Sequence, residues 1–553
     1  NSHEIIANFY SDPTHFIFEI IQNAEDAKAE FINFEISNNE LIINHNGKIF
    51  DYDDIDSITT IGNSTKKDDI NKIGKFGAGF KSVFAVTDTP RIHSGKFHFK
   101  IEDFIVPVEI QPIKLQEKLT NIILPLKNNE VKARISKKLK NLEMETLLFL
   151  NNVSEIKYQT EKNSGHYIKD RNIKENTTFG KVFIVSENNY DEATQEYFVI
   201  NNYVEIENKN LKISVAYAID NGKVVRSSSS YLSVFFPTKI DTNLNFLLQA
   251  PYRTTPNRET IPFDNQQNKI LTERLSELVA YSLNIIKKEG LLNIDLLNLL
   301  PIEKLERNSF YMSIYNSVKD AIKSNSYIPT NTGSYNTVDN LLLSRSKELT
   351  NLLSSQDLEQ LWKKTNWIEA SITQDKTPKL RDYLIKELGI DEITFEKFAR
   401  KIDEDFLQKK DDEWLIQFYS SLTEQDALFR DSPNKKSILK HKKIIKLDDE
   451  SFASLYDEND RLQIYKPIKE KSDFKTIKKI FLENKHSQIF FENHVITYPD
   501  KFSELKEFVY TKYKTSDINI SFEEYEHDIY KIISIYSTRE KDEKKKEIIN
   551  LFQ

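Results

Sequence analysis

The first 145 residues alternate between helical and extended patterns of apolar residues. A helix is expected to begin after Ser11 or Asp12, either of which can cap it, with Pro13 in its first turn. Strands are expected over residues 31–36, 41–43 and 120–126. The pattern therefore predicts an α+β module with an antiparallel sheet. The apolar stripe of its first helix recurs at helical spacing and comprises Phe16, Ile17, Ile20, Ile21 and Ala24.

The pattern changes between about residues 147 and 283, where strand-like runs alternate with polar loops. Residues 181–185 and 197–200 are examples of these runs, and the serine-rich stretch 227–230 is expected to be a hairpin loop. A helical stretch over residues 268–287 ends the region. This part of the chain therefore predicts a second, mainly extended α/β domain.

From about Gly290 the chain is rich in Leu, Lys, Glu and Asp, and its spacing favours helices. A weak internal echo, in which an apolar residue, a polar turn and an aromatic residue recur, predicts short hairpins over residues 328–335 and 445–452. We therefore expect a mostly helical C-terminal region, whose last part is small and either α/β or helical. The four expected domains cover residues 1–145, 146–290, 291–440 and 441–553.

Composition excludes several classes of function. The chain has 553 residues, no cysteine, and ten scattered histidines without an H-E-x-x-H pair, which excludes disulfides, thiolate metal sites and that kind of zinc site. Its net charge of −8 argues against nonspecific coating of nucleic acid, so a nucleic-acid partner is not indicated. Without a membrane-spanning apolar run or a secretory signal, a cytoplasmic protein without a membrane partner is expected.

Glu19, Asn23 and Asp26 lie at positions i, i+4 and i+7 of the first helix and share one polar face. A glutamate there can accept a proton from an attacking water, and an asparagine offers a neutral oxygen to Mg²⁺. The alternative is an ordinary solvated face, since the pattern alone is too short to be specific.

A glycine-rich segment follows about fifty residues later. It has the spacing G-x-x-G-x-G and holds three of the chain's 12 glycines, Gly74, Gly77 and Gly79. Glycines allow backbone N–H groups to approach phosphate oxygens closely. The spacing is neither a Walker A loop nor the dinucleotide-binding fingerprint. The alternative to a phosphate-binding loop is a flexible turn.

The order and spacing of these segments resemble the GHKL ATPases, which include gyrase B, heat-shock chaperones, histidine kinases and MutL. Within that superfamily, the chain most resembles the N-terminal ATPase region of sacsin and its bacterial relatives. The resemblance implies a Bergerat ATP-binding α/β sandwich, a transducer-like middle domain, and ATP and Mg²⁺ as cofactors. It makes Glu19 the general base and Asn23 the Mg²⁺ ligand. The residues implied for nucleotide binding are Asn23, Asp26, Ala27, His45, Gly47, Phe50, Ser64, Lys66, Gly74, Lys75, Phe76, Gly77, Ala78, Gly79, Phe80, Thr120 and Lys239.

One of these segments, residues 45–49, departs from the superfamily pattern. The superfamily has Asp-x-Gly-x-Gly, whose Asp accepts the adenine amino group, whereas this chain has His45 in place of the Asp and Ile49 in place of the second Gly. A neutral histidine can still accept one hydrogen bond, so His45 is expected to face the base. Asn46-Gly47 is also a common tight hairpin signal, which remains the alternative.

A downstream segment, residues 246–271, resembles the middle-domain stretch of the heat-shock chaperones that delivers an arginine to the γ-phosphate. By that match Arg258 is the transition-state cation, a role that suits a planar, permanently charged donor. Lys239 is the rival phosphate sensor. The alternative for Arg258 is a salt bridge. For Ser64 and Lys66 a polar loop, and for Thr120 a buried strand, explain the segments equally well.

The resemblance implies an ATPase that drives a conformational clamp, as the motor or sensor of a bacterial stress or anti-phage defence protein. Its partners would be the nucleotide, a protein client or partner subunit, and a second copy that joins it in a homodimer on ATP binding. The alternative is a nucleotide-gated protein-binding scaffold with little turnover, which the substitution at His45 favours.

Overall fold

The computed structural model describes residues 12–60, 79–114, 118–173, 177–189, 191–254, 260–433, 436–468, 474–513, 520–537, 545–546 and 549–550. The chain forms two compact units. The first comprises Asn1–Pro329, Gly333–Val338 and Ser371–Gly389, and the second comprises Thr330–Thr332, Asp339–Ala370 and Ile390–Gln553. The four domain ranges expected from the sequence stay predictions.

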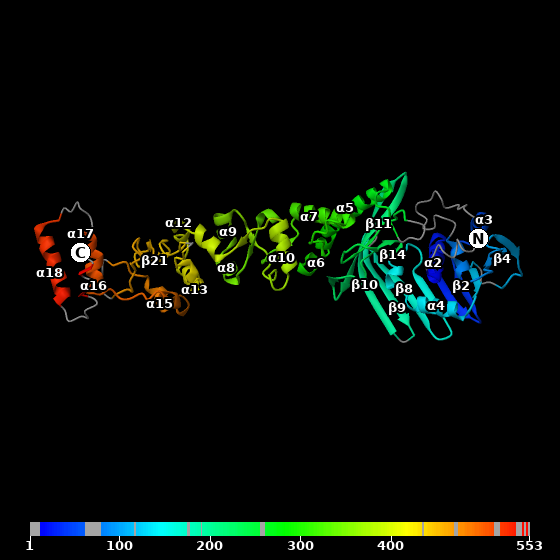
Figure 1. Cartoon of the computed structure of the whole chain (residues 1–553), viewed down its shortest axis with the longest axis horizontal. Helices are drawn as coiled ribbons and strands as arrows, with labels where there is room; N and C mark the ends of the chain where they lie inside the picture. Colours follow the sequence, from blue (N-terminus) through cyan, green and yellow to red (C-terminus); the bar gives the residue numbers. More distant parts are fainter. Residues whose placement is uncertain are drawn as a thin grey trace. The chain divides into compact units, whose positions relative to one another are not determined.

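The first unit is built on one mixed sheet, which has fifteen strands among the residues described. Its order is β14-β13-β15-β11-β10-β9-β8-β7-β1-β2-β6-β3-β4-β5, with β12 paired to β11; the long strands β8 to β11 run side by side (Figure 1). The strands are β1 (Phe31–Ser37), β2 (Glu40–His45), β3 (Arg91–Ser94), β4 (Phe97–Glu102), β5 (Val106–Glu109), β6 (Thr120–Pro125), β7 (Glu155–Gln159), β8 (Ser164–Ile173), β9 (Phe179–Asn188), β10 (Asp191–Ile206), β11 (Lys209–Asp220), β12 (Lys223–Val225), β13 (Tyr231–Val234), β14 (Phe236–Asp241) and β15 (Leu247–Gln249).

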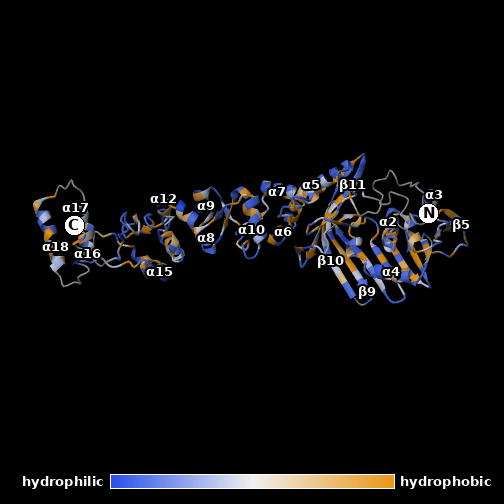
Figure 2. Cartoon of the chain, viewed as in Figure 1, coloured by the Kyte–Doolittle hydropathy of each residue, from blue (hydrophilic) through white to orange (hydrophobic). Residues whose placement is uncertain are grey.

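Most neighbouring strands of this sheet are antiparallel. The exceptions are the pairs β1–β7 and β13–β15, which are parallel. Because β7 pairs with β1, the strands that follow residue 146 continue the sheet of the N-terminal module without a break. The strands alternate in hydropathy, as Figure 2 shows, and in β9 enclosed and open positions follow one another residue by residue.

Helices and turns of the first unit pack around this sheet. They are η1 (Pro13–His15), α2 (Phe16–Asp26), α3 (Tyr52–Thr59), η2 (Phe80–Ala85), α4 (Asn129–Lys140), η3 (Met144–Thr146), α5 (Gln266–Lys288), α6 (Ile294–Leu299), α7 (Ser309–Ser324), α10 (Pro378–Asp382) and the π-helical turn η5 (Tyr383–Glu387). Helix α5 packs against β10, β11 and α7.

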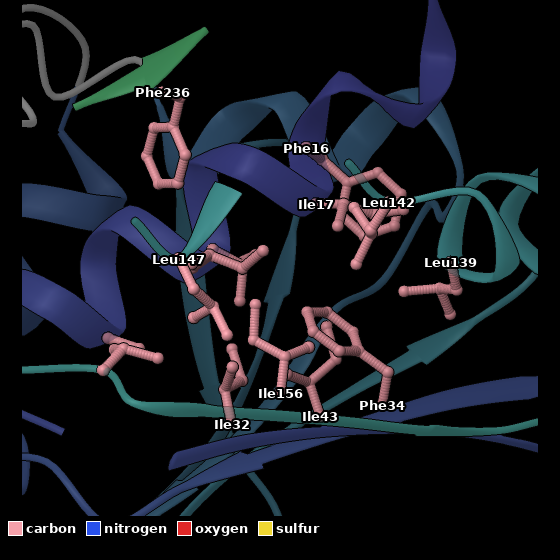
Figure 3. Close-up of a cluster of buried hydrophobic side chains, with 14 of the residues drawn as sticks. Phe16, Ile17, Ile32, Phe34, Ile43, Leu139, Leu142, Leu147, Ile156 and Phe236 are labelled. Carbon is pink, nitrogen blue, oxygen red and sulfur yellow. The ribbon is translucent and has the colours of Figure 1, made fainter. Parts of the chain in front are cut away.

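The core of the N-terminal part lies between α2 and the strands beneath it. The whole expected stripe of α2, from Phe16 to Ala24, is buried. Phe16 and Ile17 come from the helix and Ile32, Ile43 and Ile156 from β1, β2 and β7 (Figure 3). This packing fixes which face of α2 is left for polar side chains.

Among the residues described, the second unit contains helices and two small sheets around its own core. Its strands are β18 (Leu341–Ser344), β19 (Asn366–Trp367), β20 (Glu392–Ile393), β21 (Ile445–Lys446) and β22 (Phe452–Ala453). The turn η4 (Val338–Asn340) precedes β18. Its helices are α8 (Lys347–Leu352), α9 (Ser355–Trp362), α11 (Phe395–Lys401), α12 (Glu404–Leu407), α13 (Asp412–Leu422), η6 (Asp426–Leu428), α14 (Lys479–Glu483), α15 (Lys485–Asn493), α16 (Lys501–Glu504), the π-helical turn η7 (Leu505–Tyr510), α17 (Thr511–Tyr513) and α18 (Phe522–Ser537).

Both hairpins expected from the internal echo are confirmed. In the first unit β16 (Ile328–Pro329) pairs antiparallel with β17 (Tyr335–Asn336), and in the second β21 pairs antiparallel with β22. The predicted α+β class is therefore confirmed, and the structure has a large mixed sheet and many helices. Within the ranges described, no helix has the length and apolar character needed to cross a membrane.

Candidate functional site

Helix α2 begins as the sequence predicts. The Asp12 carboxylate accepts hydrogen bonds from the Thr14 N–H (2.9 Å) and the Thr14 hydroxyl (2.8 Å), and Pro13 occupies the first turn. This cap fixes where the helix starts and hence which residues share its polar face. On that face Glu19 is only 4% exposed, and its Oε1 lies 3.9 Å from Nδ1 of His15, one turn earlier.

Glu19 lies against the last glycine of the predicted phosphate loop. A Cβ atom placed on Gly79 would overlap Oε2 of Glu19, so a side chain at residue 79 would make the flexible end of Glu19 shift. Gly79 has an ordinary φ of −59° and precedes η2, where its carbonyl accepts a hydrogen bond from the Ser82 hydroxyl (2.5 Å). The Glu19 carboxylate thus occupies the space beside residue 79. The structure brings the predicted base and this end of the loop together.

The other end of α2 meets Gly47. A Cβ on Gly47 would lie 2.8 Å from both Cβ and the carbonyl oxygen of Ala27, and the Lys48 N–H donates to that same oxygen (2.8 Å). The alternative of an Asn46-Gly47 hairpin is not what the fold uses, because the chain continues into α3. Instead the Asn46 side chain accepts from the Glu30 N–H (2.8 Å) and ties the end of β2 to the turn after α2.

Replacing Gly47 with Ala is expected to destabilise the protein by about 1–3 kcal/mol, because the added methyl would lie too close to both the Cβ and the backbone carbonyl oxygen of Ala27. Chemical denaturation measures the loss. The matched control is the same change in an Ala27→Gly background, which removes the Cβ contact; the cost of Gly47→Ala should be smaller there. Equal costs in the two backgrounds would show that this contact is not the cause.

His45, at the end of β2, is 3% exposed and neutral. Burial lowers the pKa of His45 to about 4, so the imidazole carries no charge at neutral pH. Its Nδ1 accepts a hydrogen bond from the Gly47 N–H (N···N 3.2 Å). A neutral imidazole has one donor and one acceptor nitrogen, so this bond assigns the proton to Nε2.

A row of polar side chains crosses three strands at the level of His45. Thr120 on β6 lies opposite His45 on one side and Ser94 of β3 on the other, and these alternating positions face the same side as the core. The Ser94 and Thr120 hydroxyls are 2.6 Å apart, and Ser94 Oγ also accepts from the Phe50 N–H (2.9 Å). Thr120 is fully buried and Phe50 is half-buried. Both predicted residues therefore join the His45 end of the site.

The remaining predicted residues fall into two groups. Asn23 and Asp26 are half-buried on the polar side of α2, and Phe80 is buried at the start of η2. Lys239 is exposed on β14, whose Phe236 ring packs on Phe18 of α2 at 5.6 Å between centroids. Residues that lie outside the described ranges are Ser64, Lys66, Gly74, Lys75, Phe76, Gly77, Ala78 and Arg258.

Comparison with known proteins points to sacsin. A family model described as the sacsin domain matches residues 3–107, the part that contains α2, β1, β2 and Gly79. The chain is 38% identical to the protein NO VEIN of Arabidopsis thaliana over 114 aligned residues. This alignment covers 19% of this chain and 4% of NO VEIN. It is 34% identical to sacsin of Homo sapiens over 103 aligned residues, an alignment that covers 16% of this chain and 2% of sacsin. The predicted sacsin-like relationship is confirmed for this part.

The chain thus aligns with only a few hundredths of the length of these relatives. Among solved structures, the crystal structure of the N-terminal domain of a DNA repair protein is similar with a TM-score of 0.31 and 13% identity, covering 49% of this chain and 94% of that one. A TM-score this low carries no argument about function. Membership of the GHKL superfamily stays a prediction.

Sequence reasoning missed Glu25, which fastens the end of α2 to the next part of the sheet. This carboxylate is 4% exposed and accepts hydrogen bonds from the N–H groups of three successive residues, Asn151 (2.7 Å), Asn152 (3.0 Å) and Val153 (2.8 Å). The sequence places Glu25 within the pattern of α2, but only the fold shows that its hydrogen-bond partners lie in the loop before β7.

Basic side chains surround this loop as well. Lys169 on β8 is buried and donates to the carbonyls of Leu147 (2.9 Å) and Leu150 (2.7 Å), and Lys212 on β11 donates to the Asn151 side chain (2.8 Å). Burial lowers the pKa of Lys212 to about 8 and that of Lys169 well below its ordinary value, while the Glu25 charge opposes the shift. The loop before β7 is therefore fixed by Glu25 of α2 and by Lys169 and Lys212 of the sheet.

Ser94 was missed as well. It precedes the β3–β4 turn, where Gly95 adopts a φ of +55°, and only the strand register shows that it faces Thr120. Within the described ranges, no group of three or more acidic or histidine side chains is arranged to hold a metal. A cavity of about 530 Å³ in the second unit is lined by Asn331, Ser354, Trp414 and the Asp357–Lys410 ion pair among others, and none of the predicted site residues borders it.

Proposed function

We propose that the N-terminal part of this chain binds and hydrolyses a nucleoside triphosphate, with ATP as the expected substrate, in the manner of a GHKL module. The observation that carries the proposal is the placement of both ends of α2: Glu19 against Gly79 at one end, and Ala27 against Gly47 at the other. With a rise of 1.5 Å per residue, Glu19 and Ala27 are about 12 Å apart along the helix. That span suits an extended nucleotide, with the phosphates near Gly79 and the base near His45.

At the phosphate end Glu19 is the candidate general base. Its carboxylate would take a proton from the water whose oxygen bonds to the γ-phosphorus, as the bond to the leaving diphosphate breaks. The absence of a side chain on Gly79 is what leaves room for this carboxylate. Arg258, proposed from the sequence, would stabilise the developing charge on the phosphoryl oxygens.

The donor set at α2 fits Mg²⁺ held jointly with a nucleotide. Asn23 supplies a neutral side-chain oxygen from the face that also carries Glu19, and no cluster of three acidic or histidine ligands occurs in the described ranges, so phosphates would complete the coordination. When bound, the ion would neutralise charge on the β- and γ-phosphates. Asn23 and the helix that fixes its direction would orient it.

Replacing Asn23 with Ala is expected to abolish the Mg²⁺-dependent part of ATP binding, because the neutral oxygen ligand is removed. Calorimetric titration with ATP, with and without Mg²⁺, measures it. The control is Asn33→Ala on β1, whose side chain alternates onto the other face of the sheet and bonds to Asn44 (3.0 Å); it should bind as wild type does. Unchanged Mg²⁺ dependence in Asn23→Ala would remove Asn23 from the site.

We further propose that nucleotide turnover moves the strands after residue 146, as a clamp that acts on a protein client or a second copy of the chain. Support comes from the sheet, which passes from β1 to β7 without interruption, and from the Glu25 anchor to the loop before β7. The similarity to sacsin and NO VEIN supports a role of the sacsin type; a motor or sensor role in bacterial stress or defence is the sequence-based form of that proposal.

A further inference from the structure

One polar atom of His45, at the base end of the proposed site, has no hydrogen-bond partner among the described residues. His45 is 3% exposed, and its Nδ1 accepts a hydrogen bond from the Gly47 N–H. Among the described residues Nε2 makes no hydrogen bond, yet it is not one of the fully enclosed polar atoms. Nε2 therefore keeps a small part of its surface open to solvent.

The position of His45 directs this atom toward the proposed nucleotide. Leu41, Ile43 and His45 alternate onto the face of β2 that packs under α2, while Ile42 and Asn44 lie on the opposite face. The same level of the sheet carries Thr120 and Ser94. The free nitrogen thus belongs to the polar row between the strand ends and the C-terminal end of α2.

The bond between Nδ1 and the Gly47 N–H decides whether Nε2 is a hydrogen-bond donor or an acceptor. The Gly47 N–H can only donate, so Nδ1 must accept and, in the neutral ring, Nε2 must carry the hydrogen. The opposite tautomer would point two N–H groups at each other in a buried place, at the cost of an unsatisfied donor. His45 therefore presents a donor, whereas the carboxylate expected there in the superfamily would present an acceptor.

Resting on the proposed function, we infer that His45 selects a purine whose 6-substituent is a hydrogen-bond acceptor, so that this site takes 6-oxopurine nucleoside triphosphates at least as readily as ATP. The exocyclic amino group of adenine can only donate toward this position and meets the Nε2–H unfavourably. The 6-oxygen of inosine or guanine accepts from it. The sequence-based expectation that His45 accepts the adenine amino group would need the other tautomer.

The test compares three purine nucleotides that differ at this edge. Inosine triphosphate should bind the wild-type protein about 2–10-fold more tightly than ATP, the usual range for one gained hydrogen bond. Purine riboside triphosphate, which has no 6-substituent, should fall between them. His45→Asp keeps an acceptor for the Gly47 N–H and offers a second acceptor oxygen to the ligand, so it should reverse the order and favour ATP by about 10-fold or more.

The outcomes distinguish a failure of the inference about His45 from a failure of the proposed function. Tighter binding of ATP than of inosine triphosphate by the wild type would overturn the inference and leave nucleotide binding standing. Failure of every nucleotide to bind would overturn the proposed function itself. A nitrogen-resolved NMR spectrum of the unliganded wild type needs no variant: a proton on Nε2 of His45 supports the inference, and a proton on Nδ1 contradicts it.

Discussion

Glu19→Gln is expected to lower the rate of phosphate release by about 10²–10⁴-fold while leaving ATP affinity nearly unchanged, because the amide keeps the shape of the side chain but cannot take a proton. The carboxylate is 4% exposed and lies against Gly79, so a substitution of the same size should be accommodated without rearrangement. Steady-state phosphate release, with nucleotide binding measured separately, gives both quantities.

The matched control for this experiment is Glu35→Gln on β1, an exposed carboxylate on the face of the sheet that α2 does not cover. It should hydrolyse ATP at the wild-type rate. If Glu19→Gln also retains that rate, the general-base role is refuted. If the wild type binds ATP but releases no phosphate, the chain fits the alternative of a nucleotide-gated scaffold.

The second large effect concerns stability. Glu25→Ala is expected to destabilise the first unit by about 3 kcal/mol or more, because it leaves the N–H groups of Asn151, Asn152 and Val153 without their acceptor in an enclosed place. It also leaves the buried Lys169 nearby without the opposing charge. Thermal unfolding should show a clear drop in the midpoint temperature.

Glu35→Ala serves as the control for this variant too, since that exposed carboxylate should change stability by no more than about 0.5 kcal/mol. A loss below about 1 kcal/mol in Glu25→Ala would mean that water replaces the carboxylate at little cost. In that case the Glu25 contact could not transmit a strain from α2 to the loop before β7, and the proposed clamp would lose its main link.

The local elements of the fold could be predicted because their causes are local. Helix α2 follows from the Asp12 cap and the apolar stripe, the first two strands follow from alternation, and both hairpins follow from a turn between apolar residues. What decides these elements lies within a few residues of them. The α+β class is the sum of such local signals.

The arrangement of the site could be predicted only in part. The motif order indicated that α2 and the glycine loop belong together, but not that Oε2 of Glu19 occupies the space where a side chain of residue 79 would lie. The tautomer of His45 depends on a backbone N–H two residues away together with burial under α2. Ser94 depends on a register between strands far apart in sequence. Long-range contacts of this kind leave no periodic signal.

The measurement that tests the central claim most directly is a crystal structure of the protein with Mg²⁺ and a non-hydrolysable ATP analogue. We expect the nucleotide alongside α2, with its base beside His45, Gly47 and Thr120, its metal on Asn23, and its phosphates at Gly79 next to Glu19. A nucleotide bound anywhere else, such as the cavity of the second unit, or a site along α2 that stays empty at saturating concentration, would contradict the account.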